Sequence, residues 1–390
     1  MTYDRKRRRN TALALKLKRQ IGEHGPISVA DYMNACLQDP AHGYYRCRTA
    51  IGAAGDFITA PEITQVFGEL IGMWCAVVWQ QMGSPGNLNL IELGPGRGSL
   101  MRDVLRAAKV LPRFGDALAV HLIESSTVLA QQQKDALAGN ASPIEWHEHL
   151  HDVPAGPSII FANEFLDTIE VDQIVKVDEG WRQRGVSVDQ NGRLCFVETH
   201  LCAGELTCSN EIADAPTGAI NETQLFAPLT LPLAELAAQA DATSGSASAS
   251  PMAALFIDYG YNEPLLGETL QAVRNHKHEH PLTSPGEADL TAHVDFDAFS
   301  FQACGLAHVR GVNFACDGPV TQAEFLGNLG IAERTALLMQ ANPGKAGAIE
   351  MASARLMAPQ GMGTRFKAIA IRSKSLSPLP GFAPRMHRAR

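Results

Sequence analysis

The chain has 390 residues, of which 45% are hydrophobic and 19% charged, and its formal net charge is −8. The length exceeds an average domain of about 150 residues and predicts two or three domains, or one enlarged domain. The composition excludes a disordered chain, and the longest apolar run, about ten residues, is too short to cross a membrane as a helix.

The charge is distributed unevenly along the chain. Residues 1–20 hold eight Lys or Arg and one Asp, and residues 373–390 hold four Lys or Arg and no acid, which leaves −19 on residues 21–372. An acidic body argues against nucleic acid as the main partner, because nucleic-acid affinity depends on clustered positive charge. We interpret the basic run Arg5–Arg9 as a solvated, frayed terminus, with a targeting or nucleic-acid arm as the alternative.

The eight cysteines are dispersed and form no CxxC pair, which predicts reduced thiols and neither a disulfide nor a zinc framework. Since the basic run does not resemble an amphipathic presequence, we expect a bacterial cytoplasmic protein, or a protein of the mitochondrial matrix if the source is eukaryotic. No membrane insertion is expected, and the sequence leaves the oligomeric state open.

Residues 1–85 are predicted to form a helical front segment. Apolar residues recur at helical spacing from Ile63 to Val78, and Thr59-Ala60-Pro61-Glu62 is typical of a capping-box start, so we predict one helix from Thr59 to Met82. Thr59 and Glu62 are either caps alone or also ligand contacts.

From residue 87 the pattern changes to alternating strands and helices, repeated about every thirty residues, as in βαβ units. Strands are predicted over Asn87–Leu93, Leu118–Glu124, Ile144–Leu150 and Ser158–Asn163. This alternation indicates an α/β fold with a doubly wound parallel sheet.

The rest of the chain interrupts and then completes this sheet. An antiparallel meander is predicted over Val171–Thr199 and a flexible loop over 204–251, and the sheet resumes with strands at Ala253–Tyr259, Leu306–Phe314 and Phe366–Arg372. The predicted division is a helical segment (1–85), a cofactor-binding core (86–164 and 251–373), an inserted substrate subdomain (165–250) and a basic tail (374–390).

The most informative stretch is Glu92-Leu93-Gly94-Pro95-Gly96-Arg97-Gly98-Ser99, which follows a strand and opens a helix. Such glycine turns let the backbone approach a nucleotide-like ligand. The spacing is GxGxG instead of the GxGxxG of a dinucleotide site, which favours S-adenosylmethionine and disfavours a nicotinamide dehydrogenase.

Acidic and histidine residues follow the next two predicted strands. Glu124 ends the second strand, where a carboxylate can accept hydrogen bonds from a ribose diol, although an ordinary exposed strand end is the alternative. His147, His149 and His151 follow at the third strand, where the adenine would lie; they lack a metal-binding spacing, so we predict no metal site.

The fourth predicted strand ends in Asn163-Glu164-Phe165-Leu166-Asp167. Two acids near a helix start can simply complement the helix dipole. We favour the alternative that Glu164 and Asp167 hold a cationic methyl acceptor, since this strand end faces the crevice of a doubly wound fold.

Together these motifs resemble the family of the MidA protein and the mitochondrial complex I assembly methyltransferase, which are class I adenosylmethionine-dependent enzymes that modify arginine. The matching motifs are Asp39 to Tyr45, Gly55 to Ile63, the glycine turn, Asn163 to Asp167, Ile257 to Gly260, Gly286 to Phe296, Thr321 to Leu326 and Gly361 to Gly363. The resemblance implies a class I (Rossmann-like) methyltransferase fold, and symmetric dimethylation of an arginine on the quinone-side peripheral-arm subunit of respiratory complex I during assembly.

The predicted site follows from the motifs and the resemblance together. Glu164 is expected to be the principal ligand of the guanidinium group, with Asp167 and Asp258 secondary. The cofactor residues are expected to be Glu92, Gly94, Pro95, Gly96, Gly98, Glu124, Ser125, His149, Leu150, Asn163, Thr59 and Pro61. Two alternatives stay open: a methyltransferase that acts on another protein or a small molecule, and an assembly chaperone that binds the cofactor without turnover.

Overall fold

The computed structural model describes residues 4, 7–47, 59–140, 142–201, 215–239, 250–263 and 265–382. The chain divides into two compact units, each built from three segments. The smaller unit comprises Met1–Phe57, Asp167–Leu225 and Tyr261–Asp295, and the larger unit comprises Ile58–Leu166, Phe226–Gly260 and Phe296–Arg390.

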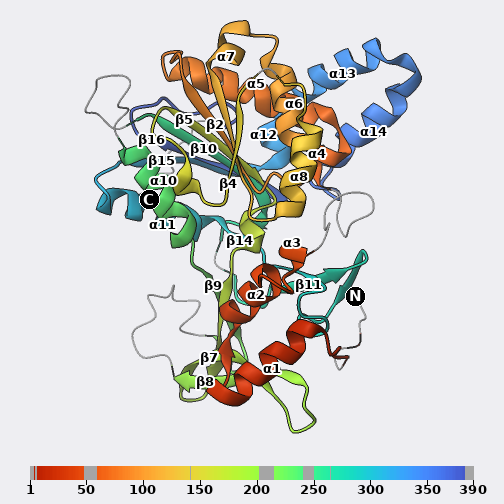
Figure 1. Ribbon diagram of the computed structural model, residues 1–390, viewed down its shortest axis with the longest axis vertical. Coiled ribbons are helices and arrows are strands. Elements are labelled where there is room, and N and C mark those ends of the chain that lie inside the picture. The colour runs from red at the N-terminus through yellow and green to blue at the C-terminus, as the bar shows by residue number, and fades with distance from the viewer. Residues whose placement is uncertain are drawn as a thin grey trace. The chain divides into compact units, whose positions relative to one another are not determined.

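The larger unit is built on a twisted sheet whose strands follow the order β15-β16-β10-β5-β2-β3-β4 (Figure 1). The strands are β2 (Leu88–Leu93), β3 (Leu118–Ile123), β4 (Ile144–His147), β5 (Ser158–Asn163), β10 (Met252–Tyr261), β15 (Phe314–Thr321) and β16 (Phe366–Ser373). β4, β3, β2, β5 and β10 are parallel, while β16 runs antiparallel to both of its neighbours, β10 and β15. The predicted α/β doubly wound sheet is thereby confirmed, with one reversed strand near its edge.

Helices cover both faces of this sheet. They are α4 (Ala60–Ile63), α5 (Gln65–Gln81), α6 (Ser99–Ala108), α7 (Pro112–Ala117), α8 (Thr127–Ala136), α10 (Ala227–Ala238), α11 (Phe296–Val309), α12 (Gln322–Asn328), α13 (Ile331–Ala341) and α14 (Ala346–Met357), with short 3-10 turns at Leu150–Asp152 and Pro343–Lys345. Strand β10 shows how the faces differ, because alternate residues of a strand point to opposite sides. Leu255 and Ile257 join the core formed with α5 and α6, whereas the ring of Phe256 packs against Phe299 of α11.

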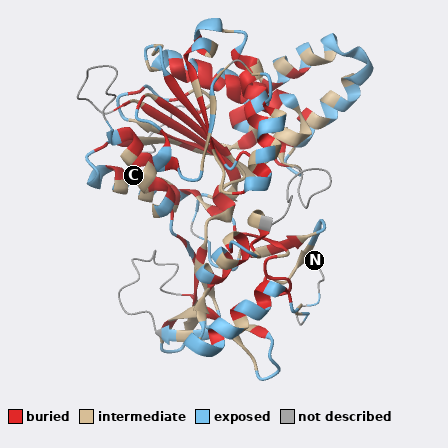
Figure 2. Ribbon diagram, in the orientation of Figure 1, coloured by how far each residue is buried: buried red, intermediate tan, exposed pale blue. Residues whose placement is uncertain are grey.

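The central strands of this unit are the most deeply buried, whereas the edge strands β4 and β15 are mostly intermediate in exposure (Figure 2). Every residue of β2 is buried, as are the first five residues of β5. Continuous apolar strands are what a parallel sheet covered on both faces requires. The predicted strands at Asn87–Leu93, Leu118–Glu124, Ser158–Asn163, Ala253–Tyr259 and Phe366–Arg372 are confirmed to within two residues at each end.

The predicted single helix from Thr59 to Met82 is wrong in one respect. Thr64 has an extended backbone (φ −157°, ψ 139°) that separates α4 from α5, and its hydroxyl accepts a hydrogen bond from the Val66 amide at the start of α5. The predicted capping box is also wrong, because Thr59 makes no side-chain cap bond to α4. Glu62 is instead engaged with the glycine turn, as described below.

The predicted strand over Leu306–Phe314 is wrong. Helix α11 continues to Val309, and strand β15 begins only at Phe314. The buried residues Phe296, Phe299, Ala303 and Ala307 lie three or four positions apart, so the apolar face of a helix continues into the segment that we read as a strand.

The smaller unit contains an antiparallel sheet in the order β1-β7-β6-β9, with β8 paired to β7. Its elements are α1 (Ala12–His24), β1 (Ile27–Ser28), α2 (Val29–Gln38), α3 (Tyr44–Cys47), β6 (Val171–Val177), β7 (Gly180–Val188), β8 (Leu194–Leu201), β9 (Ile220–Gln224), β11 (Gln271–Arg274), β12 (Lys277–Glu279), β13 (Asp289–Thr291), β14 (Val294–Asp295) and a 3-10 turn at Leu166–Thr168. The predicted meander over Val171–Thr199 is confirmed as β6, β7 and β8.

The smaller unit has a hydrophobic core of its own. Leu13 and Leu17 of α1, Tyr32 of α2, Val186 of β7 and Leu290 of β13 are all buried in it. Helices α1 and α2 therefore pack with the meander, although we predicted them to belong with the helix that became α4 and α5. The amphipathic faces of α1 and α2 carry no information about which sheet they cover, so the sequence could not assign them.

Two segments expected to be irregular contain regular structure. Within 204–251, which we predicted to be a flexible loop, β9 and the buried helix α10 are formed, whereas 202–214 and 240–249 lie outside the described residues. The expectation of a frayed run at Arg5–Arg9 is wrong for its last two residues: Arg8 donates to the Leu194 carbonyl at 2.9 Å, and Arg9 pairs with Glu287. No helix in the described part of the chain is long and apolar enough to span a membrane.

Candidate cofactor and acceptor site

The glycine turn connects β2 to α6. Gly94, Gly96 and Gly98 have positive φ values of 60°, 55° and 78°, and Gly98 is the N-cap of α6. Residues with a Cβ rarely adopt this conformation, so the turn requires glycine at all three positions. The helix N-terminus and the bare backbone are thus presented at the carboxyl end of the first core strand, next to Pro95.

Two acidic residues frame the glycine turn. Glu92, the second-to-last residue of β2, is only 3% exposed, and burial raises its pKa to about 8, while the Met101 amide lowers it and Glu124 raises it. One oxygen of Glu92 has no hydrogen-bond partner among the described residues. Glu62 of α4 accepts a 2.6 Å bond from the Ser99 hydroxyl and lies 3.6 Å from Arg97, so α4 is tied to the turn.

Glu124 follows β3 and is held by a residue that the sequence analysis missed. Gln133, fully buried on α8, donates from its side-chain amide to Glu124 Oε2 and to the Gly96 carbonyl, both at 2.9 Å. Its Oε1 accepts from the Trp146 indole at 3.0 Å. Gln133 therefore links the glycine turn, the carboxylate after β3 and strand β4, while Ser125 lies between Glu124 and α8.

Strand β4 is shorter than the predicted strand. β4 ends at His147, and a 3-10 turn starts at Leu150, so the predicted strand Ile144–Leu150 is confirmed only in its first half. His149 is exposed and Leu150 is buried. The rings of His149 and His151 stack with centroids 5.0 Å apart.

Glu164 directly follows β5 and has a backbone conformation that is unusual for a residue with a side chain, with φ of 53°. Such conformations are retained where the surrounding structure enforces them, and they are concentrated at functional sites. Glu164 Oε1 accepts from the Ala60 amide at 3.3 Å and from the Asn163 side chain at 3.2 Å. The start of α4, which carries Thr59 and Pro61, is thereby brought to Glu164.

Asp258 and Phe165 complete this strand end. Asp258 is fully buried, and its two oxygens accept from the Phe165 amide at 2.9 Å and the Tyr259 amide at 2.8 Å. A Cβ added to Gly94 would lie 2.8 Å from Phe165 Cδ2. The turn after β5 is therefore fixed from one side by Asp258, and the Phe165 ring lies against the glycine turn on the other.

Asp167 belongs to the smaller unit and is 5% exposed. In the same unit the Tyr45 hydroxyl donates to both oxygens of the buried Asp289, at 2.9 and 3.1 Å. Burial raises the pKa of Tyr45, and the nearby charges of Asp289 and Asp167 raise it further. The sequence analysis recognised the motif around Asp289 but assigned it no place, because the phenol–carboxylate pair joins residues 244 positions apart.

In the larger unit, the glycine turn after the first core strand and the carboxylate after the next lie at the carboxyl edge of an open parallel sheet. This arrangement defines the Rossmann-like class of proteins that bind nucleotide-containing cofactors at that edge. A family model of S-adenosyl-L-methionine-dependent methyltransferases matches residues 70–313, and the chain belongs to this family.

Relatives and solved structures agree with this assignment. The chain is 34% identical over 389 residues to "Protein arginine methyltransferase NDUFAF7, mitochondrial" from Danio rerio, covering 93% of this chain and 87% of the relative. The human protein of the same name is also 34% identical, with 93% and 83% covered. A COG1565 superfamily member and likely methyl transferase from Burkholderia thailandensis, solved bound to S-adenosyl-homocysteine, has a TM-score of 0.76 and 25% identity, with 95% and 94% covered.

The protein is thus a class I S-adenosylmethionine-dependent methyltransferase, and the predicted fold class and cofactor are confirmed. The residues at the carboxyl edge suit this cofactor, since three glycines leave the backbone of the turn uncovered at alternate positions and Glu92 presents a buried, unsatisfied oxygen beside it.

Proposed function

We propose that the protein is a protein arginine methyltransferase that symmetrically dimethylates an arginine on the quinone-side subunit of the complex I peripheral arm during assembly. The relatives from Danio rerio and human support the arginine acceptor, since both are named protein arginine methyltransferases and match over 93% of this chain. Their names also contain the word mitochondrial, which supports the mitochondrial matrix as the place of action if the source is eukaryotic.

We assign the cofactor to the carboxyl edge of the larger unit. Gly94, Pro95, Gly96 and Gly98 would cradle it, with Glu92 beside the turn and Glu124 and Ser125 at the ribose. His149 and Leu150 would border the adenine, and Thr59, Pro61 and Asn163 would lie at the methionine end. When bound, S-adenosylmethionine supplies an electrophilic methyl group on a sulfonium.

The observation that carries the proposed acceptor is the conformation of Glu164. A guanidinium group is protonated at neutral pH, so its nitrogen becomes a good nucleophile only when the cation is oriented and a proton can leave. Carboxylates hold the planar fork by charge-assisted hydrogen bonds. Glu164 is fixed at positive φ, and its Oε1 accepts from the Ala60 amide. We assign it to hold the guanidinium and to stabilise the charge as the proton leaves.

Asp167 and Asp258 take different parts in this proposal. Asp167, three residues after Glu164 in the sequence, stays the second carboxylate that we assign to the cationic acceptor. Asp258, which we expected to be a secondary ligand of the guanidinium, has both oxygens engaged by backbone amides at full burial. It is better fitted to hold the Glu164–Phe165 turn, and we treat it as a positioning residue.

The test uses purified protein, labelled methyl donor and the purified quinone-side subunit, with the product analysed by mass spectrometry. Glu164→Gln should bind S-adenosylhomocysteine like the parent and lose at least about a hundredfold in methyl transfer, as is typical for a positioned acid–base group. Glu350→Gln, an exposed change on α14, is the matched control and should keep full activity.

Other outcomes would change the proposal. Parent-like transfer by Glu164→Gln would reject its role. Labelling of another protein or a small molecule, with none on the subunit, would replace the acceptor. Stable association with the subunit without any transfer by the parent would favour an assembly chaperone that binds the cofactor.

A further inference from the structure

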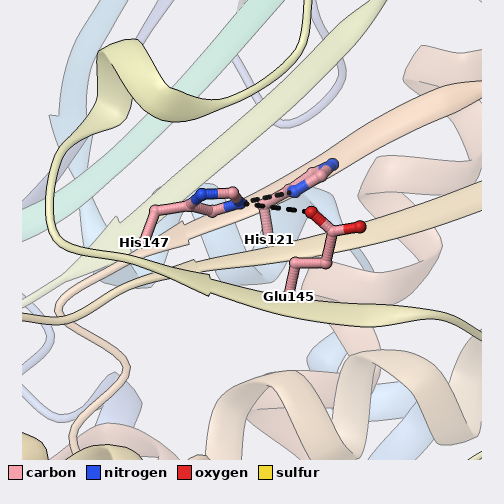
Figure 3. Close-up of side chains that lie close together, drawn as sticks. All are labelled: His121, Glu145 and His147. Atoms are coloured by element: carbon pink, nitrogen blue, oxygen red, sulfur yellow. Dashed lines mark hydrogen bonds and ion pairs between the residues drawn. The ribbon is translucent and has the colours of Figure 1, made fainter.

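Strands β3 and β4 place two histidines and a glutamate together at the edge of the larger unit's sheet (Figure 3). His121 of β3 lies directly opposite Glu145 of β4 in the parallel register, and His147 is two positions further along β4. Because residues two apart on a strand point to the same face, all three side chains converge on one side of the sheet. The cluster therefore rests on rigid backbone rather than on loops.

The distances between the donor atoms suit a shared ion. His121 Nδ1 lies 3.0 Å from His147 Nε2, and His147 Nε2 lies 3.8 Å from Glu145 Oε2. One ligand atom from each of the three residues lies within 4.8 Å of the others. Zinc bonds to nitrogen and oxygen are about 2.0–2.2 Å long, so atoms that share one ion are separated by about 3–4 Å.

Both histidines of the cluster are largely shielded from solvent. His121 is 2% exposed, and the His147 side chain is 12% exposed. The Nε2 atom of His121 is buried without a hydrogen-bond partner among the described residues, so His121 makes its contact within the cluster through Nδ1.

We propose that His121, Glu145 and His147 form a binding site for a divalent transition-metal ion, with zinc as the ion that best fits the donor set. Two imidazole nitrogens and one carboxylate oxygen suit zinc better than the all-oxygen preference of calcium or magnesium. Three protein ligands leave a fourth position for water. The Glu145 side chain is 62% exposed, which gives the ion access from solvent.

The position of the site indicates a structural effect. β4 has only four residues and forms the edge of the sheet, and the metal would join it to β3 through side chains. The His147 carbonyl already accepts from the Glu124 amide at 2.9 Å, so the same residue borders the carboxylate that we assign to the ribose. Bound metal should therefore stabilise β4 and the turn with His149 and Leu150 that follows it.

The experiment uses the full chain with any affinity tag removed, freed of metal by a chelator and dialysed. Titration with Zn²⁺ by calorimetry should show one site per chain and a higher melting temperature when the site is filled. Titration with Co²⁺ should give the visible absorption of a tetrahedral site, without a sulfur-to-cobalt charge-transfer band. The spectrum separates this cluster from the paired thiols Cys304 and Cys316, which belong to α11 and to β15 at the opposite edge of the sheet.

Glu145→Gln, a change at an exposed side chain, and His147→Ala should each weaken Zn²⁺ binding by at least about tenfold, or about 1.4 kcal/mol. His151→Ala is the matched control, since this exposed histidine lies outside the cluster, and it should bind like the parent. Unchanged affinity in both Glu145→Gln and His147→Ala would overturn the proposal. So would binding of less than one equivalent by the parent, or loss of the site on replacement of Cys304 and Cys316 by serine.

Discussion

The ring of Phe165 lies against the α-carbon of Gly94, so that a methyl group at Gly94 would approach Phe165 Cδ2 to 2.8 Å. Gly94→Ala would also place a side chain at φ of 60°, which costs roughly 1–2 kcal/mol. We expect this variant to displace the ring and to bind S-adenosylhomocysteine at least about tenfold more weakly, as measured by calorimetry.

Gly139→Ala provides the control for this change. Gly139 has a comparable φ of 80°, but nothing lies within 4 Å of an added Cβ. Gly139→Ala should lower the free energy of unfolding, measured by chemical denaturation, because of its strained backbone alone. It should keep the parent's affinity for S-adenosylhomocysteine. Equal affinity losses in the two variants would show that the Phe165 contact is irrelevant to binding.

Gln133 should affect both stability and cofactor affinity. Gln133→Leu removes the donor to Glu124 and Gly96 and the acceptor for Trp146 while keeping a similar volume. A buried polar group left unsatisfied costs about 1–3 kcal/mol, so we expect at least this loss in the free energy of unfolding, with weaker product binding. Gln131→Leu, an exposed change on the same helix, should alter neither quantity.

Glu92 should make stability depend on pH. Its pKa is about 8 in the folded protein, above the ordinary 4.5, so the native state keeps a proton that the unfolded chain has released. Glu92 therefore does not reduce the free energy of unfolding at pH values below its pKa in the unfolded chain. It reduces that free energy progressively as the pH rises from there toward about 8. Glu92→Gln does not ionise and should gain stability relative to the parent between about pH 5 and about pH 8.

Urea unfolding at several pH values would measure this gap. One pKa unit is equivalent to about 1.4 kcal/mol, so the gap should widen by several kcal/mol across the range. Glu350→Gln, at an exposed position, should show no such widening. A constant difference between Glu92→Gln and the parent would mean that Glu92 is ionised in the folded protein throughout.

Cys304 should be the most reactive of the described buried or half-buried thiols at neutral pH. Cys304 and Cys316 lie 3.3 Å apart, and the hydrogen bond from Cys316 lowers the pKa of Cys304 to about 7. Burial raises the pKa of Cys36 to about 12 and raises that of Cys75 as well. Since the thiolate is the nucleophile, a disulfide reagent should modify Cys304 first, as peptide mapping would show.

Cys316→Ala tests the cause of this reactivity. The variant removes the hydrogen-bond donor, so the pH at which Cys304 reacts at half its maximal rate should rise toward the ordinary thiol range. An unshifted pH profile would assign the reactivity of Cys304 to exposure alone.

The central sheet was predictable because its inner strands are continuous apolar runs, the pattern expected of strands buried on both faces. The segment Ser158–Asn163 is apolar enough that its limits were found to the residue. The break at Thr64 was not predictable, because hydrophobic periodicity continues across a single residue whose backbone turns extended. The limit between α11 and β15 was missed for a related reason: short apolar runs do not distinguish a helix end from a strand.

The parts of the site that depend on one segment were predictable, and those that depend on packing between segments were not. The glycine turn and Glu164 stand directly after apolar strands, which marks them in the sequence. Gln133 lies four residues after the buried Leu129 on α8, so a polar residue on an apolar stripe was the available signal. The His121 and His147 pair depends on the register of β3 and β4, which no local pattern contains.

The three-segment composition of each unit has a consequence for how the protein can be made. The nascent chain cannot complete the smaller unit before residue 295 has been synthesised, and β16, which joins β10 to β15, is not available until residues 366–373 have followed. Neither unit exists as a continuous stretch of the gene, so neither can be expressed alone by truncation or exchanged as a cassette. A chain stopped before residue 295 leaves both units unfinished, whereas a chain stopped between residues 295 and 366 leaves only the larger unit unfinished.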